Sequence, residues 1–184
     1  NNGTLSSMDP ATDWISSPVS CNSSLQDPST LPGKALDFDG TNDIVETQFI
    51  MPTTSAFSIQ AWIYPRATFY KRIVSNFDGV GSAGSGEIVL DTYNATDNGR
   101  ALRLTVQTGV ISTANVLTLN AWNHVSATFD NGLMTIYVNG FDVGNITVGF
   151  TSVSTIGKKF ILGEDNVIGG STEYFNGKMD EVRF

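Results

Sequence analysis

Residues 35–47 read ALDFDGTNDIVET, and this stretch decides the fold class. Apolar and polar residues alternate over Ala35–Phe38, the run stops at Asp39-Gly40, and alternation resumes from Ile44. Alternation with period two is typical of a half-buried strand, and Gly, Asn and Asp favour turns. The stretch therefore predicts a strand, an acidic turn and a second strand, arranged either as a hairpin or as a corner.

The composition of the 184-residue chain agrees with an all-β domain. Only 15% of the residues are charged, 40% are hydrophobic, and 18 are glycine. A chain of this length can bury a full core in one domain, and many glycines suit short strands joined by tight turns. We predict one domain over residues 1–184, excised from a larger multidomain protein, with residues 9–33 as a Pro-rich surface loop.

About a dozen strands are expected in the whole chain. In Phe57–Pro65, alternation places Phe57, Ile59, Ala61 and Ile63 toward the core and Ser58, Gln60, Trp62 and Tyr64 away from it. The dipeptides Asn131-Gly132 and Asn139-Gly140 predict two tight hairpin turns. Further strands are expected at 1–5, 70–77, 86–93, 100–106, 110–113, 122–130, 133–138, 141–148, 160–163 and 174–184. Such a set closes naturally as a two-sheet antiparallel jelly roll.

The charge and the rare residue types exclude several classes of function. With 18 acidic and 10 basic residues the formal charge is −8, so we expect no nucleic-acid partner. The single Cys21 cannot form an internal disulfide, and the single His124 excludes a histidine-rich zinc site. No apolar stretch is long enough to predict insertion into a membrane.

Five sequence blocks occur in an order that resembles the laminin-G-like group of concanavalin A-like jelly-roll domains. They are ALDFDGTNDIV at 35–45, FSIQAWIYP at 57–65, WNHVSATFDNGLMTIYVNG at 122–140, FILGED at 160–165 and FNGKMDEVRF at 175–184. The resemblance covers residues 34–184. It implies two stacked antiparallel sheets, an extracellular or cell-surface setting within a larger protein, and in many members a structural calcium ion. The missing disulfide pair favours a bacterial protein.

The acidic turn suggests where a calcium ion would bind. Calcium prefers six to eight oxygen ligands, and Asp39, Gly40, Asn42 and Asp43 offer several from one turn. The resemblance implies Asp180 as a distant ligand, because the last strand of the family commonly carries a calcium-binding aspartate. Alternation would then place Asp180 on one face with Val182 and Phe184. The alternative is that the aspartates only shape the turn and that Asp180 caps a strand end.

Catalysis is not expected. The nearest approach to a glycosidase motif is Glu87–Asp91, whose carboxylates are four residues apart with Val89 between them and no second Glu after them. No nucleophile-elbow motif accompanies His124, which we expect to be a packed, hydrogen-bonding residue.

The outward positions of the central strands suggest a ligand-binding face. Trp62 and Tyr64 on one strand, His124 on another and Tyr137 on its hairpin partner combine rings with hydrogen-bonding groups, as a sugar requires. One alternative is that residues 9–33 or 78–85 cover Trp62 and Tyr137 as a minor core. Another is that a ligand contacts loop residues near the predicted calcium ion, including Tyr174 and Tyr93. The sequence therefore predicts a non-catalytic carbohydrate-binding or adhesive module, or else a structural spacer or protein–protein module.

Overall fold

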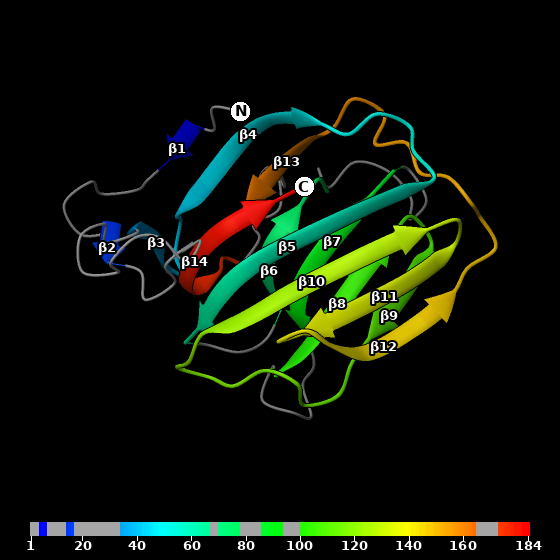
Figure 1. The fold of residues 1–184 in the computed structure, drawn as a ribbon. Helices are drawn as coiled ribbons and strands as arrows, with labels where there is room; N and C mark the ends of the chain where they lie inside the picture. Colours follow the sequence, from blue (N-terminus) through cyan, green and yellow to red (C-terminus); the bar gives the residue numbers. More distant parts are fainter. Residues whose placement is uncertain are drawn as a thin grey trace, which may run out of the picture.

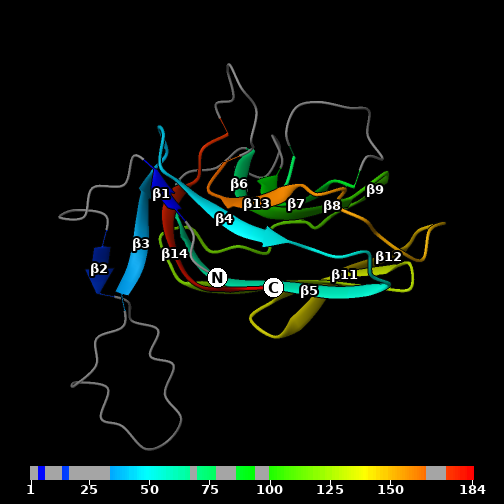
Figure 2. The same cartoon turned by 90° about the horizontal axis from the view of Figure 1, so that it is seen from above.

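The protein is a sandwich of two seven-stranded antiparallel sheets. The computed structural model describes residues 4–6, 14–16, 34–66, 70–77, 86–93, 100–164 and 173–184. Sheet A has the order β1 (Thr4–Ser6), β4 (Ile44–Ile50), β13 (Lys159–Leu162), β6 (Lys71–Ser75), β7 (Ile88–Tyr93), β8 (Ala101–Val106), β9 (Gly109–Ser112). Sheet B has the order β12 (Phe141–Thr147), β11 (Leu133–Val138), β10 (Asn123–Asp130), β5 (Ala56–Pro65), β14 (Asn176–Arg183), β3 (Lys34–Asp39), β2 (Trp14–Ser16). Figure 1 shows sheet B in front, and Figure 2 shows the two layers from above.

The opening stretch is a corner and not a hairpin. Its first strand, β3, belongs to sheet B, while its second strand, β4, belongs to sheet A. The turn between them is closed by its own side chains, because Asp39 Oδ1 accepts hydrogen bonds from the amides of Thr41 (2.6 Å) and Asn42 (3.4 Å). Gly40 has φ +82°, and an added Cβ would lie 2.7 Å from Nδ2 of Asn176. The turn therefore needs both an aspartate and a glycine in order to pass the chain from one sheet to the other.

Both predicted Asn-Gly turns are confirmed. Asn131 and Gly132 have φ +48° and +96°, and Asn139 and Gly140 have φ +52° and +84°. Positive φ at both central residues is the signature of the type I′ turn, whose twist matches the flanking strands. These turns fix the register of β10, β11 and β12 and so determine which side chains point outward from this end of sheet B.

The core lies between the sheets, as the alternation predicts. Along β5, Ile59, Ala61 and Ile63 are fully buried, while Trp62 and Tyr64 on the opposite side are half-buried. The largest fully buried side chains are Phe38, Phe129, Phe160, Phe175, Ile59, Ile63, Ile73, Ile88, Leu90, Leu102, Leu104 and Leu117. Ten of these twelve come from strands of the two sheets, and Leu117 and Phe175 come from the segments beside them. Burial of these side chains is the main stabilising contribution to the fold.

Two predictions about strands are wrong in detail. Trp14–Ser16, inside the predicted loop 9–33, forms β2 and pairs with β3; the rest of that loop lies outside the described residues. In β14 the register shifts between Asp180 and Arg183, and Glu181 has φ +52°. This bulge interrupts the alternation, so Val182 packs against the core while Asp180 lies on the outer face.

The part of the chain that the structure describes contains no helix long and apolar enough to span a membrane.

Candidate functional site

All four residues predicted to contact a ligand lie on the outer face of sheet B. Trp62 and Tyr64 project from β5, His124 from β10 and Tyr137 from β11, each on the side opposite the buried residues of its strand. Each of the four is half-buried. We call this surface the aromatic face. The other predicted possibility, coverage by residues 9–33 or 78–85, concerns segments that the structure describes only at 14–16.

The strand register brings the rings into edge-to-face contact. His124 is opposite Trp62 in the β10–β5 pair, and their ring centroids are 5.2 Å apart at an interplanar angle of 63°. Tyr64 meets Trp122 at 5.8 Å and 69°. Lys178, opposite Tyr64 in the β14–β5 pair, places its ammonium group 5.0 Å from the Tyr64 ring centroid. These contacts hold each ring against a neighbour and limit its motion.

Polar groups are interspersed with these rings. Asp180 is opposite Trp62, and Ser126 is opposite both Gln60 and Tyr137. The amide of Glu181 donates a hydrogen bond of 2.8 Å to Asp180 Oδ1. Tyr137 lies two strands away from Trp62 across the sheet and is displaced by two residues along the strand direction. Strand spacing therefore puts the two residues about 12 Å apart. The aromatic face is therefore wider than one sugar ring and carries both acceptors and donors.

An ion pair limits one end of the aromatic face. Both terminal nitrogens of Arg66 donate to the carboxylate of Asp37, at 2.5 and 2.6 Å. Asp37 is opposite Lys178, which in turn is opposite Tyr64. This bidentate geometry orients both side chains and keeps the charged residues beside the rings in fixed positions.

We expect His124 to make the folding stability of the protein depend on pH. Burial lowers the pKa of its imidazole below the ordinary value of 6.5. The imidazole of His124 therefore binds a proton more readily in the unfolded chain, where its pKa is about 6.5, than in the folded protein, where its pKa is lower. We expect the free energy of unfolding to fall as the pH falls through about 6.5. Urea unfolding between about pH 5 and 7 measures this, with His124→Gln expected to flatten the slope. An identical slope in the variant would show that other groups cause it.

The residues predicted to bind calcium do not converge on one site. Asn176 is opposite Asp39, and Asp180 lies four residues further along β14, which corresponds to about 13 Å. Asp180 instead shares the aromatic face with Trp62, because alternation along β14 is regular up to Asp180, and the bulge at Glu181 turns Val182 alone toward the core. Among the described residues, no group of three or more His, Cys, Asp or Glu side chains could hold a metal ion.

The turn itself uses its carboxylates internally. Asp39 Oδ1 accepts two amide hydrogen bonds, and Asp43 Oδ2 accepts one from the amide of Asp39 at 2.7 Å. Asn176 Nδ2 donates to the Asp39 carbonyl oxygen at 3.1 Å. The turn is therefore stabilised by hydrogen bonds to its own two carboxylates and by the side chain of Asn176. The residues Asp39, Gly40, Asn42 and Asp180 therefore do not fit a calcium ion as a set of four, and calcium binding by the turn alone stays a prediction.

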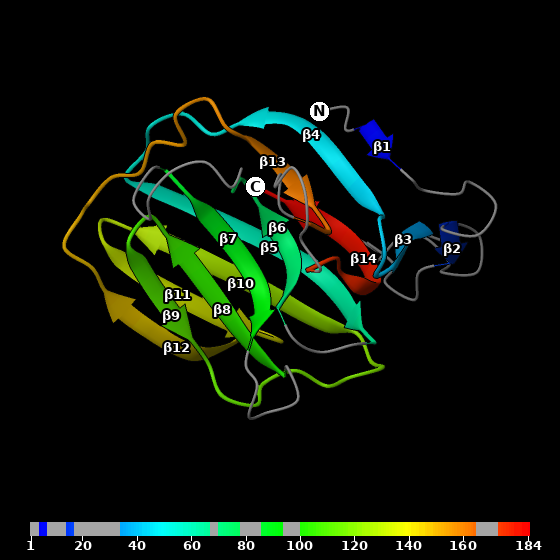
Figure 3. The same cartoon turned by 180° about the vertical axis from the view of Figure 1, so that it is seen from behind.

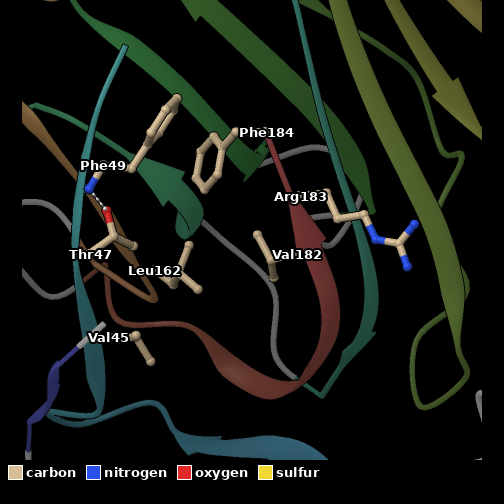
Figure 4. Close-up of a pocket in the computed structure, with 7 residues that line it drawn as sticks. All are labelled: Val45, Thr47, Phe49, Leu162, Val182, Arg183 and Phe184. Atoms are coloured by element: carbon tan, nitrogen blue, oxygen red, sulfur yellow. Dashed lines mark hydrogen bonds between the residues drawn. The ribbon is translucent and has the colours of Figure 1, made fainter. Parts of the chain in front are cut away.

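A pocket of about 450 Å³ lies at the edge of the sandwich, between β4, β13 and the end of β14 (Figure 4). It is lined by Val45, Thr47, Phe49, Leu162, Val182, Arg183 and Phe184. Figure 4 shows the guanidinium of Arg183 directed away from the apolar side chains. Thr47 Oγ1 donates to the Phe160 carbonyl oxygen and accepts from the amide of Phe49. The pocket is thus apolar, with its hydroxyl already bonded, and it lacks the oriented polar groups that a sugar needs.

A cluster of charged residues on the outer face of sheet A was not predicted from the sequence. Asp91 on β7 is 0% exposed and forms ion pairs with Arg72 on β6 and Arg103 on β8; these strands are seen in Figure 3. Burial raises the pKa of the Asp91 carboxyl, while Arg103 and Arg72 oppose that rise. The signal that could have revealed the cluster was an outward arginine in β8 beside an outward aspartate in β7.

This cluster also argues against hydrolysis at the acidic stretch Glu87–Asp91. Asp91 is bound by two guanidinium groups. Glu87 lies directly before β7 and four residues before Asp91, so the two residues are about 13 Å apart along the extended chain. Retaining glycosidases need carboxylates about 5 Å apart, and inverting enzymes need about 6.5–9.5 Å. The two acids are too far apart for either mechanism.

Comparison with models of protein families identifies the family of this chain. A family model described as the concanavalin A-like lectin/glucanases superfamily (Laminin_G_3) matches residues 39–184. The chain belongs to this family. The assignment confirms the fold that the five sequence blocks and the two-sheet structure indicate. No curated protein matches the sequence.

Several solved structures share the fold of this Laminin_G_3 chain at low sequence identity. Domain 4 of AbnA, a GH43 extracellular arabinanase from Geobacillus stearothermophilus, in complex with arabinotriose, is 18% identical with a TM-score of 0.64; the match covers 98% of this chain and 80% of that one. A Ruminococcus gnavus sialidase CBM40 bound to α2,3-sialyllactose is 12% identical with a TM-score of 0.56, covering 68% and 73%. A candidate carbohydrate binding protein from Bacteroides ovatus is 23% identical with a TM-score of 0.60, covering 76% of this chain but only 40% of that one.

Proposed function

We propose that this Laminin_G_3 domain is a non-catalytic carbohydrate-binding module and that the aromatic face contacts the sugar. The observation that carries the proposal is the position of Trp62, Tyr64, His124 and Tyr137. They lie on one half-buried outer face together with Gln60, Ser126 and Asp180. Sugar rings present apolar C–H faces and a rim of hydroxyl groups, so they bind where rings and polar groups alternate.

The proposed mode of binding follows from the contacts on this face. The exposed parts of the Trp62 and Tyr137 rings would stack on sugar rings, while His124 and Asp180 would bond hydroxyl groups. Because the rings are held by neighbouring side chains, little side-chain entropy is lost when a sugar binds. The distance of about 12 Å between Trp62 and Tyr137 suits an oligosaccharide rather than a single sugar.

The non-catalytic part of the proposal rests on the acidic residues. Glu87 and Asp91 are too far apart for glycoside hydrolysis, and Asp91 is neutralised by arginines. Several of the solved structures with this fold are named as carbohydrate-binding proteins or modules, such as the CBM40 of a sialidase. We further propose that this domain acts at the cell surface or outside the cell, as one part of a longer bacterial polypeptide.

Replacing Trp62 by alanine is expected to weaken oligosaccharide binding about tenfold, because it removes a stacking ring from the centre of the face. A glycan array of plant, algal and host sugars, followed by titration calorimetry, measures this. Tyr137→Ala should weaken binding in the same way. Phe141→Ala is the matched control, since Phe141 lies on the edge strand β12 and is 74% exposed. If no glycan binds wild-type protein, the function is instead that of a structural spacer or protein–protein module.

Calcium binding at the corner turn can be tested separately from sugar binding. If calcium binds at the turn, excess chelator is expected to lower the melting temperature of the protein, and added calcium is expected to restore it. Asp39→Asn should abolish the difference between the two conditions, because Asp39 supplies one of the two carboxylates of the turn and the ion needs both. Identical melting curves of wild-type protein with chelator and with calcium would rule out a stabilising ion at this turn.

A further inference from the structure

Tyr70 has a backbone conformation that needs an explanation. It immediately precedes β6, its φ is +42°, and its side chain is 36% exposed. A bulky non-glycine residue with positive φ is strained, and such residues persist where the surrounding structure holds them, frequently at binding sites. Burial does not explain the strain, because a ring that is 36% exposed contributes little to the core.

The strained residue presents its ring to a second tyrosine. The centroids of Tyr70 and Tyr93 are 5.2 Å apart at an angle of 87°, so one ring stands edge-on to the other. The neighbouring Tyr93 is the main cause that raises the pKa of the Tyr70 hydroxyl above its ordinary value of 10.0. The pair offers an aromatic surface with hydroxyl groups at its rim.

Arg103 lies over both rings and is fixed from behind. Its guanidinium carbon is 4.4 Å from the Tyr93 centroid and 5.4 Å from that of Tyr70. Nε and Nη2 donate to Asp91 at 3.0 and 2.5 Å. Nη1 of Arg103 has no hydrogen-bond partner in the described part of the chain. Arg103 is thus a preorganised donor beside two rings, and the exposed Ser112 lies opposite it in the β8–β9 pair.

The charges around these rings cancel. Arg72 and Arg103 carry two positive charges, and Asp91 and Glu173, which also pairs with Arg72, carry two negative charges. An anionic ligand would gain no net attraction and would compete with Asp91 for Arg103. A neutral ligand with an apolar face and hydroxyl groups fits the rings and the remaining N–H donor without that competition.

We propose that Tyr70, Tyr93 and Arg103 form a second carbohydrate-contacting site, selective for neutral saccharides, on the sheet opposite the aromatic face. This inference extends the proposed function of the domain but depends on residues of a different sheet. The module would then contact two glycan segments at once, one on each side of the sandwich, and gain avidity on a polysaccharide.

The test is calorimetric titration in a Trp62→Ala background, with neutral arabino-, xylo- and gluco-oligosaccharides and with galacturonate oligosaccharides as probes. Tyr70→Gly is the key variant, because glycine removes the ring and the strain together. We expect it to reduce the remaining neutral-sugar affinity at least fivefold while the melting temperature stays within about 4 °C. Ile156→Gly is the matched control, since Ile156 is also strained, with φ +53°, and is 67% exposed; its affinity should not change.

The outcomes separate the two sites. Loss of all binding on Trp62→Ala alone, with no effect of Tyr70→Gly in the wild-type background, would overturn the second site and support the aromatic face. Loss on Tyr70→Gly alone would support the second site and overturn the aromatic face. Tighter binding of galacturonate oligosaccharides than of neutral ones would overturn the selectivity for neutral sugars. Absence of binding to any probe by the wild-type protein would contradict both sites.

Discussion

Replacing Phe38 by alanine is expected to lower the free energy of unfolding by about 3–5 kcal/mol. Phe38 is fully buried at the end of β3, where the chain passes from sheet B to sheet A. Its ring meets Phe175 edge-on at 5.9 Å and lies 2.7 Å from the position that a Cβ on Gly163 would occupy. The truncation would leave a cavity where the corner, β13 and the start of β14 meet.

Urea denaturation of the Phe38→Ala variant measures this effect. The matched control is Phe141→Ala, the same change at an exposed position, which should alter the unfolding free energy by no more than about 0.5 kcal/mol. A loss of less than about 1 kcal/mol at Phe38 would mean that the corner does not join the two sheets as the structure indicates.

Replacing Asp91 by asparagine is expected to cost about 3–5 kcal/mol, because it removes the charge shared by two largely buried guanidinium groups. Asp91 has no exposed surface, and its partners Arg72 and Arg103 are 11% and 19% exposed. Asparagine keeps the shape of the side chain but leaves the positive charge of Arg103 uncompensated. The measurement is again urea denaturation at neutral pH.

The control for Asp91 is Asp130→Asn, because Asp130 is exposed at the end of β10. That change should have an effect of about 0.5 kcal/mol or less. If the two variants prove equally stable, the network around Asp91 contributes nothing to stability, and the rigidity ascribed to Arg103 has no basis.

The sequence alone predicted most of the fold because period-two alternation and Asn-Gly turns report on local geometry. In β5 and β10 the alternation is uninterrupted, so Trp62, Tyr64 and His124 were assigned to the correct face. The Asn131-Gly132 turn fixed the register of β11, so Tyr137 was also placed correctly. Each of these inferences needs only residues close together in the chain.

The errors arose where long-range contacts or a backbone irregularity decide the structure. The bulge at Glu181 turns Val182 toward the core, so Asp180 and Val182 do not share a face, and the sequence MDEVRF contains no residue that predicts this bulge. The pairing of β2 with β3 depends on a long-range contact that a three-residue strand cannot reveal. Arg72, Asp91 and Arg103 come from three strands, so their meeting depends on strand order rather than on any motif.

The most direct test of the central claim is an NMR titration of the Tyr70→Gly variant, in which the second site is disabled. The probe is the neutral oligosaccharide that binds wild-type protein most tightly on the array. We predict that the largest amide shifts fall on Trp62, His124 and Tyr137, while the amide signals of β7 and β8 remain unchanged. Saturating sugar that leaves these three signals in place would contradict the assignment of sugar binding to the aromatic face.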